Sequence, residues 1–300
     1  SRKDFMTEPV MQQYAKETGV QFRVIRNGEN ELLERLRAEG SATQADLFWT
    51  QDAASLQEAS DRDYLAVLPT AVTRLVGPSL HGKDWVSFSV RARPIVYNTN
   101  LVRPEMLSTY TDLGSAKWKG KLCLRTSKKI YNQTMFASFI RNYGEKKATD
   151  IAKSWVANLA QPPFNDDTEI VKAVAEGKCA VGVVNAPYFF GYKEKNKQDA
   201  VELFYPNQSV AGGGTHINVT GVGVLRTSKN QDAAVKFVKW MLTKQAQTMY
   251  VNSTYEYPVI GGVEPREIVK PHAEFRKDAV MLDNNLLVPA ARVMDAAGYR

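Results

Sequence analysis

Segments with the spacing of amphipathic helices alternate with short, strand-like apolar segments along this chain. Val10, Met11 and Tyr14 repeat at helical spacing, which predicts a first helix over Glu8–Thr18. The elements expected after it are a strand over Val20–Ile25, a helix over Glu29–Glu39 and a strand over Asp46–Thr50. Because helical crossovers join parallel strands, this order favours an α/β fold with mostly parallel strands.

The same order of elements returns in the rest of the chain. The segments expected to be regular are strands over Lys121–Leu124, Ala180–Val184 and Gly221–Leu225, and helices over Asn132–Tyr143, Asp150–Leu159, Thr168–Glu176 (capped by Asp167) and Asp232–Leu242. Two extended stretches, Phe88–Asn98 and Thr215–Leu225, are typical of connections between lobes. Two lobes joined in this way form a hinged cleft, in which a ligand meets strand ends and helix N-termini.

Composition and charge narrow the classes of function. The chain has 300 residues, of which 44% are hydrophobic and 24% charged, as in ordinary globular proteins. No apolar run approaches the roughly 18 residues of a membrane-spanning helix, so no membrane insertion of this chain is expected. The net charge is +7, but no basic run reaches five residues, which argues against a nucleic-acid partner. The excess fits either a solvated basic surface or attraction of an anionic or anion-chelated ligand.

The cysteines and histidines give no metal or catalytic signature. Cys123 and Cys179 lie 56 residues apart and no Cys-x-x-Cys pair occurs, so a zinc site is not indicated. They are two free thiols or one disulfide, and the residues alone leave both open. His81, His216 and His272 are isolated, and neither a Gly-x-Ser-x-Gly motif nor a complete Walker loop is present. We therefore expect a protein that is not an enzyme.

Polar residues gather in three segments at the ends of expected strands or in loops: Thr126–Gln133, Asn185–Tyr192 and Asn207–Asn218. The first combines hydroxyls, lysines and a helix start, which suits an oxyanion or an ordinary helix cap. The second suits a ligand site or an aromatic packing cluster. A phenol has a pKa near 10, and a hard trivalent cation takes its phenolate oxygen. Two tyrosines that converge in a cleft would therefore point to ferric iron.

Several motifs occur in an order that is typical of one protein family. They are Glu31–Leu36, Ala45–Phe48, Trp118–Arg125, Ile130–Gln133, Pro206–Gln208, Gly214–Gly221 and Glu256–Val259. These motifs resemble the periplasmic ferric-ion-binding proteins of ABC transporters, the FutA- and FbpA-like class II solute-binding proteins. The resemblance runs from Ser1 to Arg300.

The resemblance implies the class II periplasmic-binding-protein fold, with two α/β lobes joined by hinge strands around a cleft. The N-terminal lobe is expected over residues 1–92 plus 222–262, and the C-terminal lobe over residues 93–221 plus 263–300. The resemblance also implies that Cys123 and Cys179 form a disulfide. It further implies that Ser1–Lys3 belongs to a loop that follows a first strand, which this sequence lacks.

The family's ligand residues transfer only in part. Tyr131 and Tyr188 match ligand tyrosines, and Asp4 is a third expected oxygen donor to the metal. At three other positions that match ligands of the family, this sequence has Lys3, Pro187 and Gln51, which are residues of a different chemical type from those ligands. The residues expected to hold an anion or to support the ligands are Arg91, Arg93, Ser127, Lys3, Asn185 and Gln51. Water or a synergistic anion is expected to complete the coordination of iron.

The resemblance implies a periplasmic or extracytoplasmic protein, free or lipid-anchored, that captures ferric iron and delivers it to an ABC transporter permease. We expect a monomer. The substituted ligand positions leave an alternative, in which the same fold binds an anionic organic phosphate or carboxylate. An enzyme on this scaffold is a third hypothesis, but the sequence offers no nucleophile and base in its support.

Overall fold

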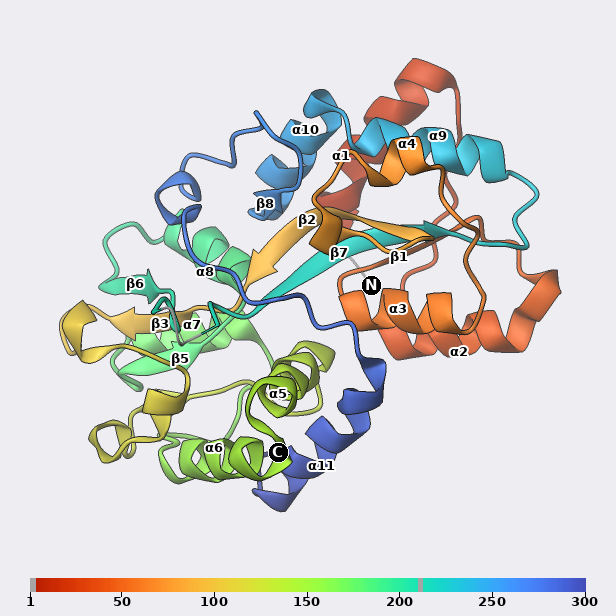
Figure 1. The fold of residues 1–300 in the computed structure, drawn as a ribbon. Coiled ribbons are helices and arrows are strands. Elements are labelled where there is room, and N and C mark those ends of the chain that lie inside the picture. The colour runs from red at the N-terminus through yellow and green to blue at the C-terminus, as the bar shows by residue number, and fades with distance from the viewer. Residues whose placement is uncertain (1–3, 210–212) are drawn as a thin grey trace. The chain divides into compact units, whose positions relative to one another are not determined.

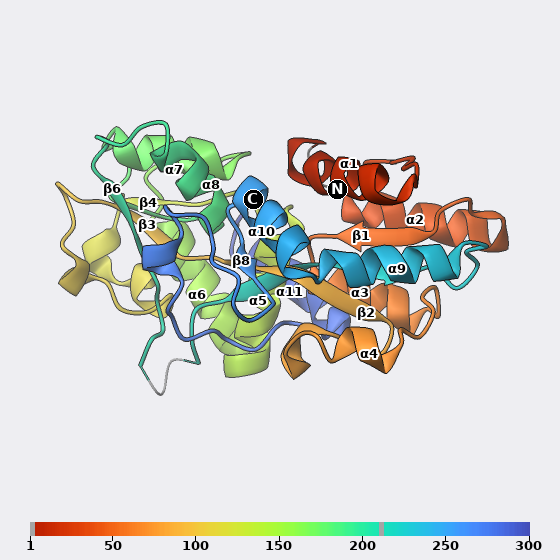
Figure 2. The ribbon, with the colours of Figure 1, turned by 90° about the horizontal axis from the view of Figure 1, so that it is seen from above.

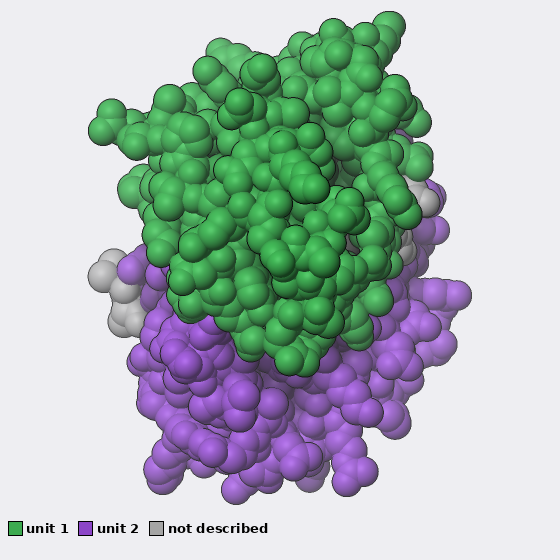
Figure 3. Space-filling model, turned by 90° about the vertical axis from the view of Figure 1, so that its right-hand side faces the viewer, with its two compact units in different colours: residues 1–90, 218–270 green, residues 91–217, 271–300 purple. Residues whose placement is uncertain are grey.

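The computed structural model describes residues 4–209 and 213–300. It divides into two compact units, coloured separately in Figure 3. Unit 1 comprises Ser1–Val90 and Asn218–Lys270, and unit 2 comprises Arg91–Ile217 and Pro271–Arg300. The sequence-based lobe boundaries at residues 92, 221 and 262 stay predictions. The chain passes between the units within β2 (Trp85–Ala92) and β7 (Ile217–Val224), which overlap the two extended stretches expected as connections, and again after Lys270.

Unit 1 is built on a sheet of strand order β1-β7-β2-β8, in which β1 is Leu47–Thr50 and β8 is Tyr257–Pro258. Its helices are α1 (Asp4–Thr18), α2 (Glu29–Glu39), α3 (Ala53–Asp61), α4 (Thr70–Thr73), α9 (Gln231–Met241) and α10 (Lys244–Thr254). Figure 1 shows α1 and α9 over one face of the sheet and α2 and α3 over the other. Apolar side chains of α1, α9, α10 and the strands form one core, because each helix turns its apolar stripe toward the sheet.

Unit 2 has a second sheet, of strand order β4-β5-β3-β6. Its strands are β3 (Ile95–Asn98), β4 (Leu122–Cys123), β5 (Val181–Val183) and β6 (Val201–Phe204), and its helices are α5 (Ile130–Tyr143), α6 (Glu145–Ala157), α7 (Asp167–Ala175), α8 (Ala186–Lys193) and α11 (Leu287–Ala296). Helices α5, α6 and α11 pack against one another in both ribbon views (Figure 1 and Figure 2). A disulfide joins Cys123 to Cys179, with 5.9 Å between their Cα atoms, as the family resemblance implies.

Short 3-10 helices connect several of these elements. They are η1 (Gly40–Ala42), η2 (Pro78–Leu80), η3 (Pro104–Met106), η4 (Thr111–Gly114), η5 (Ala116–Trp118), η7 (Lys270–His272) and η8 (Asn284–Leu286). Within the described residues, no helix is both long and apolar enough to cross a bilayer.

Two expectations about the strands are wrong. The pairings given by register in the described residues are antiparallel for β1 with β7, β2 with β8, and β3 with both β5 and β6, and only β4 with β5 is parallel. Strand direction depends on where the chain enters each sheet, which helical and strand periodicity does not reveal. Val20–Ile25 alternates in polarity like a strand but pairs with no described strand. Alternation shows that one side of a segment is apolar, but it does not show that a second strand lies beside it to form hydrogen bonds.

Candidate functional site

Two tyrosines of unit 2 stand at the starts of helices that follow neighbouring strands. Tyr131 is the second residue of α5, and Tyr188 is the third residue of α8. The preceding strands, β4 and β5, are parallel neighbours, so the segments after them leave the sheet at the same edge. The positive end of the helix dipole at each helix start favours anions. The two tyrosines expected to be ligands therefore belong to one edge of one sheet.

Two guanidinium groups lie against the ring of Tyr131. The central guanidinium carbon of Arg93 is 5.4 Å from the ring centre, and that of Arg125 is 5.0 Å from it. Both arginine side chains are buried, where contact between a cation and an aromatic face is attractive. Arg93 is one of the residues expected to support the site. Sequence analysis does not single out Arg125, although it closes the Trp118–Arg125 motif.

Asp167 is a fully buried carboxylate beside both guanidinium groups. Its Oδ1 is 3.3 Å from Nη1 of Arg125, and its Oδ2 is 3.9 Å from Nη1 of Arg93. The backbone N–H of Asn185 donates a hydrogen bond of 2.8 Å to Oδ2, which ties the start of α7 to the start of α8. The expectation that Asp167 caps its helix is wrong, since the side chain of Asp166 accepts the capping hydrogen bond. Two consecutive aspartates stand at this helix start, and only one of them is needed as the cap. This is the sequence signal that could have revealed the pairing of Asp167 with the two arginines.

The guanidinium pair carries more positive charge than its carboxylate balances. Arg93 and Arg125 bring two positive charges to the single negative charge of Asp167. The Nε atoms of both arginines have no hydrogen-bond partner among the described residues. Because an unbalanced charge in a buried place is costly, a negative group beside this pair is stabilised. A phenolate on Tyr131 would supply that group.

Both phenols hold their protons tightly in the absence of a metal. Burial raises the pKa of Tyr131 far above its ordinary value of about 10, and the charge of Asp167 raises it further. Burial also raises the pKa of Tyr188, again with help from Asp167, while the buried Arg91 and then Arg125 lower it. A negative charge on Tyr188 raises the pKa of Tyr131 further, so a strongly attracting cation is needed to remove both protons.

Two asparagines shape this region. The side-chain amide of Asn132 donates to the carbonyl oxygens of Arg125 and Thr126, at 3.0 and 2.8 Å, and its oxygen accepts from Arg93 at 2.7 Å. Asn132 therefore fixes both the Arg93 side chain and the loop that leads into α5. Asn185 is 1% exposed, and its Nδ2 has no hydrogen-bond partner among the described residues. This buried donor, directly before α8, is available to a bound anion.

Ser127 lies beside a different space. It lines a cavity of about 340 Å³ in unit 2 together with Lys128, Gln133, Ala291, Met294, Asp295, Tyr299 and Arg300. Neither Tyr131 nor Tyr188 lines this cavity. An anion-binding role for Ser127 stays a prediction.

The remaining expected site residues belong to unit 1. Gln51 directly follows β1, and Asp4 is the first residue of α1, although its side chain is not described. Lys3 lies outside the described residues. In residues 4–209 and 213–300, no three His, Cys, Asp or Glu side chains are grouped so that they could hold a metal ion.

Comparison with known proteins assigns this chain to a family. The family model described as bacterial extracellular solute-binding protein matches residues 1–248. The chain belongs to this family. The solute-binding protein is 36% identical to Iron uptake protein A1 of Synechocystis sp., over 96% of this chain and 83% of that protein. It is 31% identical to Iron uptake protein A2 of the same organism, over 93% of this chain and 84% of that protein.

A solved structure agrees with this membership. The solute-binding protein superimposes on FutA of Trichodesmium, solved in complex with iron and citrate ligands, with a TM-score of 0.91 and 35% identity. The match covers 100% of this chain and 97% of that one. It confirms the class II periplasmic-binding-protein fold that the motifs imply.

Proposed function

We propose that this solute-binding protein captures ferric iron for an ABC importer, with Tyr131 and Tyr188 as phenolate ligands. The observation that carries the proposal is the buried phenol of Tyr131 beside a guanidinium pair with one positive charge in excess, with Tyr188 on a helix start that leaves the same edge of the sheet. Iron uptake by the relatives that share 36% and 31% of its residues supports the same cargo.

Ferric iron fits these donors for an electrostatic reason. A hard trivalent cation prefers oxygen ligands and displaces a phenol proton far more effectively than a divalent cation does. The raised pKa values of Tyr131 and Tyr188 therefore disfavour weakly polarising cations. Once the proton has left, Arg93 and Arg125 stabilise the Tyr131 phenolate through the charge that Asp167 does not balance.

The two phenolates need help to complete the site. They balance at most two of the three charges of ferric iron, and two oxygens fall short of the roughly six that a hard cation of this size takes. We expect a polyanionic chelator such as citrate, or water with a synergistic anion, to supply the rest. The unpartnered Nδ2 of Asn185 is the donor best placed to receive an anion oxygen. Asp4 is proposed as a further carboxylate ligand.

The activity proposed is binding and delivery, without chemical change of the cargo. The iron-loaded form is recognised by a membrane permease, and the chain acts outside the cytoplasm as a monomer. The relatives named as iron uptake proteins favour iron with its chelator over an organic phosphate or carboxylate as sole ligand.

Thermal unfolding in the presence of different ligands tests this proposal. Metal-stripped protein is heated with ferric citrate, with citrate alone, and with an organic phosphate such as fructose 6-phosphate. Ferric citrate at about 100 times its Kd should stabilise the protein by roughly 2.7 kcal/mol, and the other two should leave the midpoint unchanged. Stabilisation by the organic phosphate and none by ferric citrate would overturn the proposal.

A further inference from the structure

Two of the crossings between unit 1 and unit 2 lie in neighbouring strands. β2 leaves unit 1 after Val90, and β7 enters unit 1 at Asn218. The two strands are adjacent in the sheet of unit 1 (Figure 1). A third crossing, after Lys270, lies within the short helix η7. Because paired strands carry two of the crossings, the contacts that hold these strands on either side decide where the connection bends.

The sheet of unit 1 narrows to these two strands at the crossing. β8 pairs with β2 at Ser89 and Val90, the last residues of unit 1 on that strand. β1 pairs with β7 only as far as Gly221. In the part of the chain that the structure describes, no further strand flanks residues 91–92 or residues 217–220 on the outer side. A ribbon of two strands twists more than a wide sheet and is less stable on its own.

A buried carboxylate ties the two strands together on the unit 1 side. Glu256 is 1% exposed and stands between α10 and β8, directly after Tyr255, whose left-handed backbone ends the helix. Its Oε2 accepts a hydrogen bond from the hydroxyl of Ser89 on β2 and another, of 3.2 Å, from that of Thr220 on β7. Because a carboxylate away from water binds hydroxyl donors strongly, this one side chain fastens both strands where the sheet narrows.

Asn218 fixes β7 a second time on the same side. Its Nδ2 donates a hydrogen bond of 2.7 Å to Oδ1 of Asp52, and its Oδ1 accepts one of 2.9 Å from the backbone N–H of Ala53. Asp52 is also the N-cap of α3, since its side chain accepts from the N–H of Ser55. β7 is therefore joined to a helix of unit 1 up to its first residue in that unit, and Ile217 is the next residue beyond.

A buried phenol ties the same two segments together on the unit 2 side. The hydroxyl of Tyr110 donates a hydrogen bond of 2.6 Å to the carbonyl oxygen of Arg93 and accepts one of 3.1 Å from the backbone N–H of His216. The N–H of Arg93 also donates directly to the carbonyl oxygen of His216 at 3.0 Å. Trp155 and Asn207 bind the main chain of Tyr110, which anchors the phenol in unit 2. This contact lies one residue after β2 and one residue before β7.

We propose that Glu256 and Tyr110 are clamps on the two sides of a hinge that consists of Arg91, Ala92 and Ile217. Each clamp holds the two segments together within its own unit, so these three residues take up the rotation of one unit against the other. The clamps thus limit the range of that rotation, and loss of either one lengthens the hinge. This inference goes beyond the iron site, because it concerns the protein without a ligand.

Removal of one hydroxyl from each clamp tests the proposal. Thr220→Val removes one arm of the unit 1 clamp, and Tyr110→Phe removes the unit 2 clamp, each with little change of shape. Thr254→Val is the matched control in unit 1, because this threonine is equally buried and its hydroxyl donates within α10. Tyr192→Phe is the control in unit 2, since its hydroxyl contacts Asp199.

The distance between the units is the decisive measurement. Spin labels are attached to Glu34→Cys on α2 and Lys147→Cys on α6, which replace exposed residues of unit 1 and unit 2, and pulsed electron resonance gives the distribution of distances in metal-stripped protein. The native chain and both controls should share one distribution, and both clamp variants should broaden it. The experiment uses no iron, so its result is independent of the iron proposal.

Amide hydrogen exchange separates a hinge effect from local loosening. Exchange over residues 86–93 and 216–222 should be about tenfold faster in the clamp variants than in the controls. Equal distance distributions in the native chain and the clamp variants would overturn the proposal. Faster exchange without broader distances would also overturn it, because the clamps would then stabilise only their own surroundings. Equal broadening in the controls would overturn it as well.

Discussion

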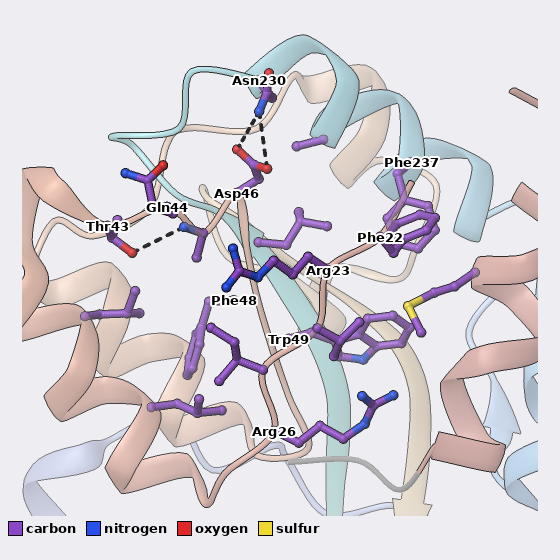
Figure 4. A pocket seen from close by; sticks show the side chains of 18 of the residues that line it. Phe22, Arg23, Arg26, Thr43, Gln44, Asp46, Phe48, Trp49, Asn230 and Phe237 are labelled. Carbon is purple, nitrogen blue, oxygen red and sulfur yellow. Dashed lines mark hydrogen bonds between the residues drawn. The ribbon is translucent and has the colours of Figure 1, made fainter. Parts of the chain in front are cut away.

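In unit 2, the loops that follow β4 and β5 are tied together by buried polar contacts. In unit 1, the segment Val20–Arg26 between α1 and α2 lines a cavity of about 690 Å³ (Figure 4) and pairs with no described strand. Asp167 and Asn132 each contact groups from two or three separate segments. Val24 and Ile25, by contrast, expose almost half of their surface. The difference teaches that buried polar side chains can hold irregular backbone in place through hydrogen bonds. An extended segment without such side chains relies on a paired strand for its backbone hydrogen bonds.

Removing the disulfide should give the largest difference in stability between the two units. Cys123 and Cys179 close a loop with a sequence separation of 56 that includes α5, α6 and α7. The double variant C123A/C179A should lose on the order of 4 kcal/mol of unfolding free energy, because the unfolded chain regains the entropy of that loop. Urea unfolding followed by hydrogen exchange should show the loss in unit 2. Equal loss of protection in unit 1 would contradict the division into two units.

Asp167→Asn tests the polar half of the comparison. The substitution leaves Arg93 and Arg125 buried without their carboxylate, which should cost about 3 kcal/mol of stability in urea unfolding. Asp166→Asn is the matched control, since asparagine is as good a helix cap and the change should be nearly neutral. Similar effects of the two variants would show that Asp167 does not hold the guanidinium pair.

The pH dependence of stability should also originate in unit 2. Burial, with Arg93 and then Arg141 nearby, lowers the pKa of His216 to about 3. The folded pKa is below the ordinary value near 6.5, so this contribution is complete above pH 6.5 and declines as the pH falls toward 3. The expected loss is about 1.4 kcal/mol per pH unit.

The check is urea unfolding of the native chain and of His216→Asn between pH 7 and pH 4. The variant should have a flatter dependence on pH. Ser138→Ala removes the hydroxyl partner of the ring, 3.3 Å from Nδ1, but keeps the titrating group, so it should keep the native slope. An unchanged slope in His216→Asn would assign the acid sensitivity to other groups.

The smallest effect is expected at the exposed side chains of Val24 and Ile25. Val24→Thr and Ile25→Thr keep β-branched shape and remove apolar surface that already faces solvent, so each should change stability by less than about 0.5 kcal/mol. Urea unfolding checks this, and a loss above about 1 kcal/mol in either variant would show that these side chains are covered in the folded protein.

Local patterns in the sequence predict much of the fold. The helix predicted over Glu29–Glu39 and the strand predicted over Asp46–Thr50 agree with α2 and β1, because apolar spacing and a glycine after the helix are local signals. Val20–Ile25 fails as a strand because its alternation says nothing about a hydrogen-bonding neighbour. The antiparallel pairing of β1 with β7 joins residues far apart in the chain, such as Leu47 and Val224, and periodicity does not reach that far.

In the candidate site, too, some residues could be predicted from the sequence and others could not. Tyr131 and Tyr188 come from motif resemblance, and their positions at helix starts follow from short-range patterns. The roles of Arg125 and Asp167 are not visible in the sequence, because their ion pair joins segments 42 residues apart. The anion-binding role of Ser127 stays a prediction, and the cavity beside Ser127 is lined by neither tyrosine.

Visible absorption during titration with ferric citrate tests the central claim most directly. Metal-stripped native protein should develop a phenolate-to-iron charge-transfer band that saturates at one equivalent. Tyr188→Phe and Tyr131→Phe should each weaken or abolish the band, while Tyr192→Phe should keep it, because the Tyr192 hydroxyl contacts Asp199 outside the cluster. A flat spectrum for the native protein, or a band that survives in both ligand variants, would contradict the claim that these two tyrosines bind iron.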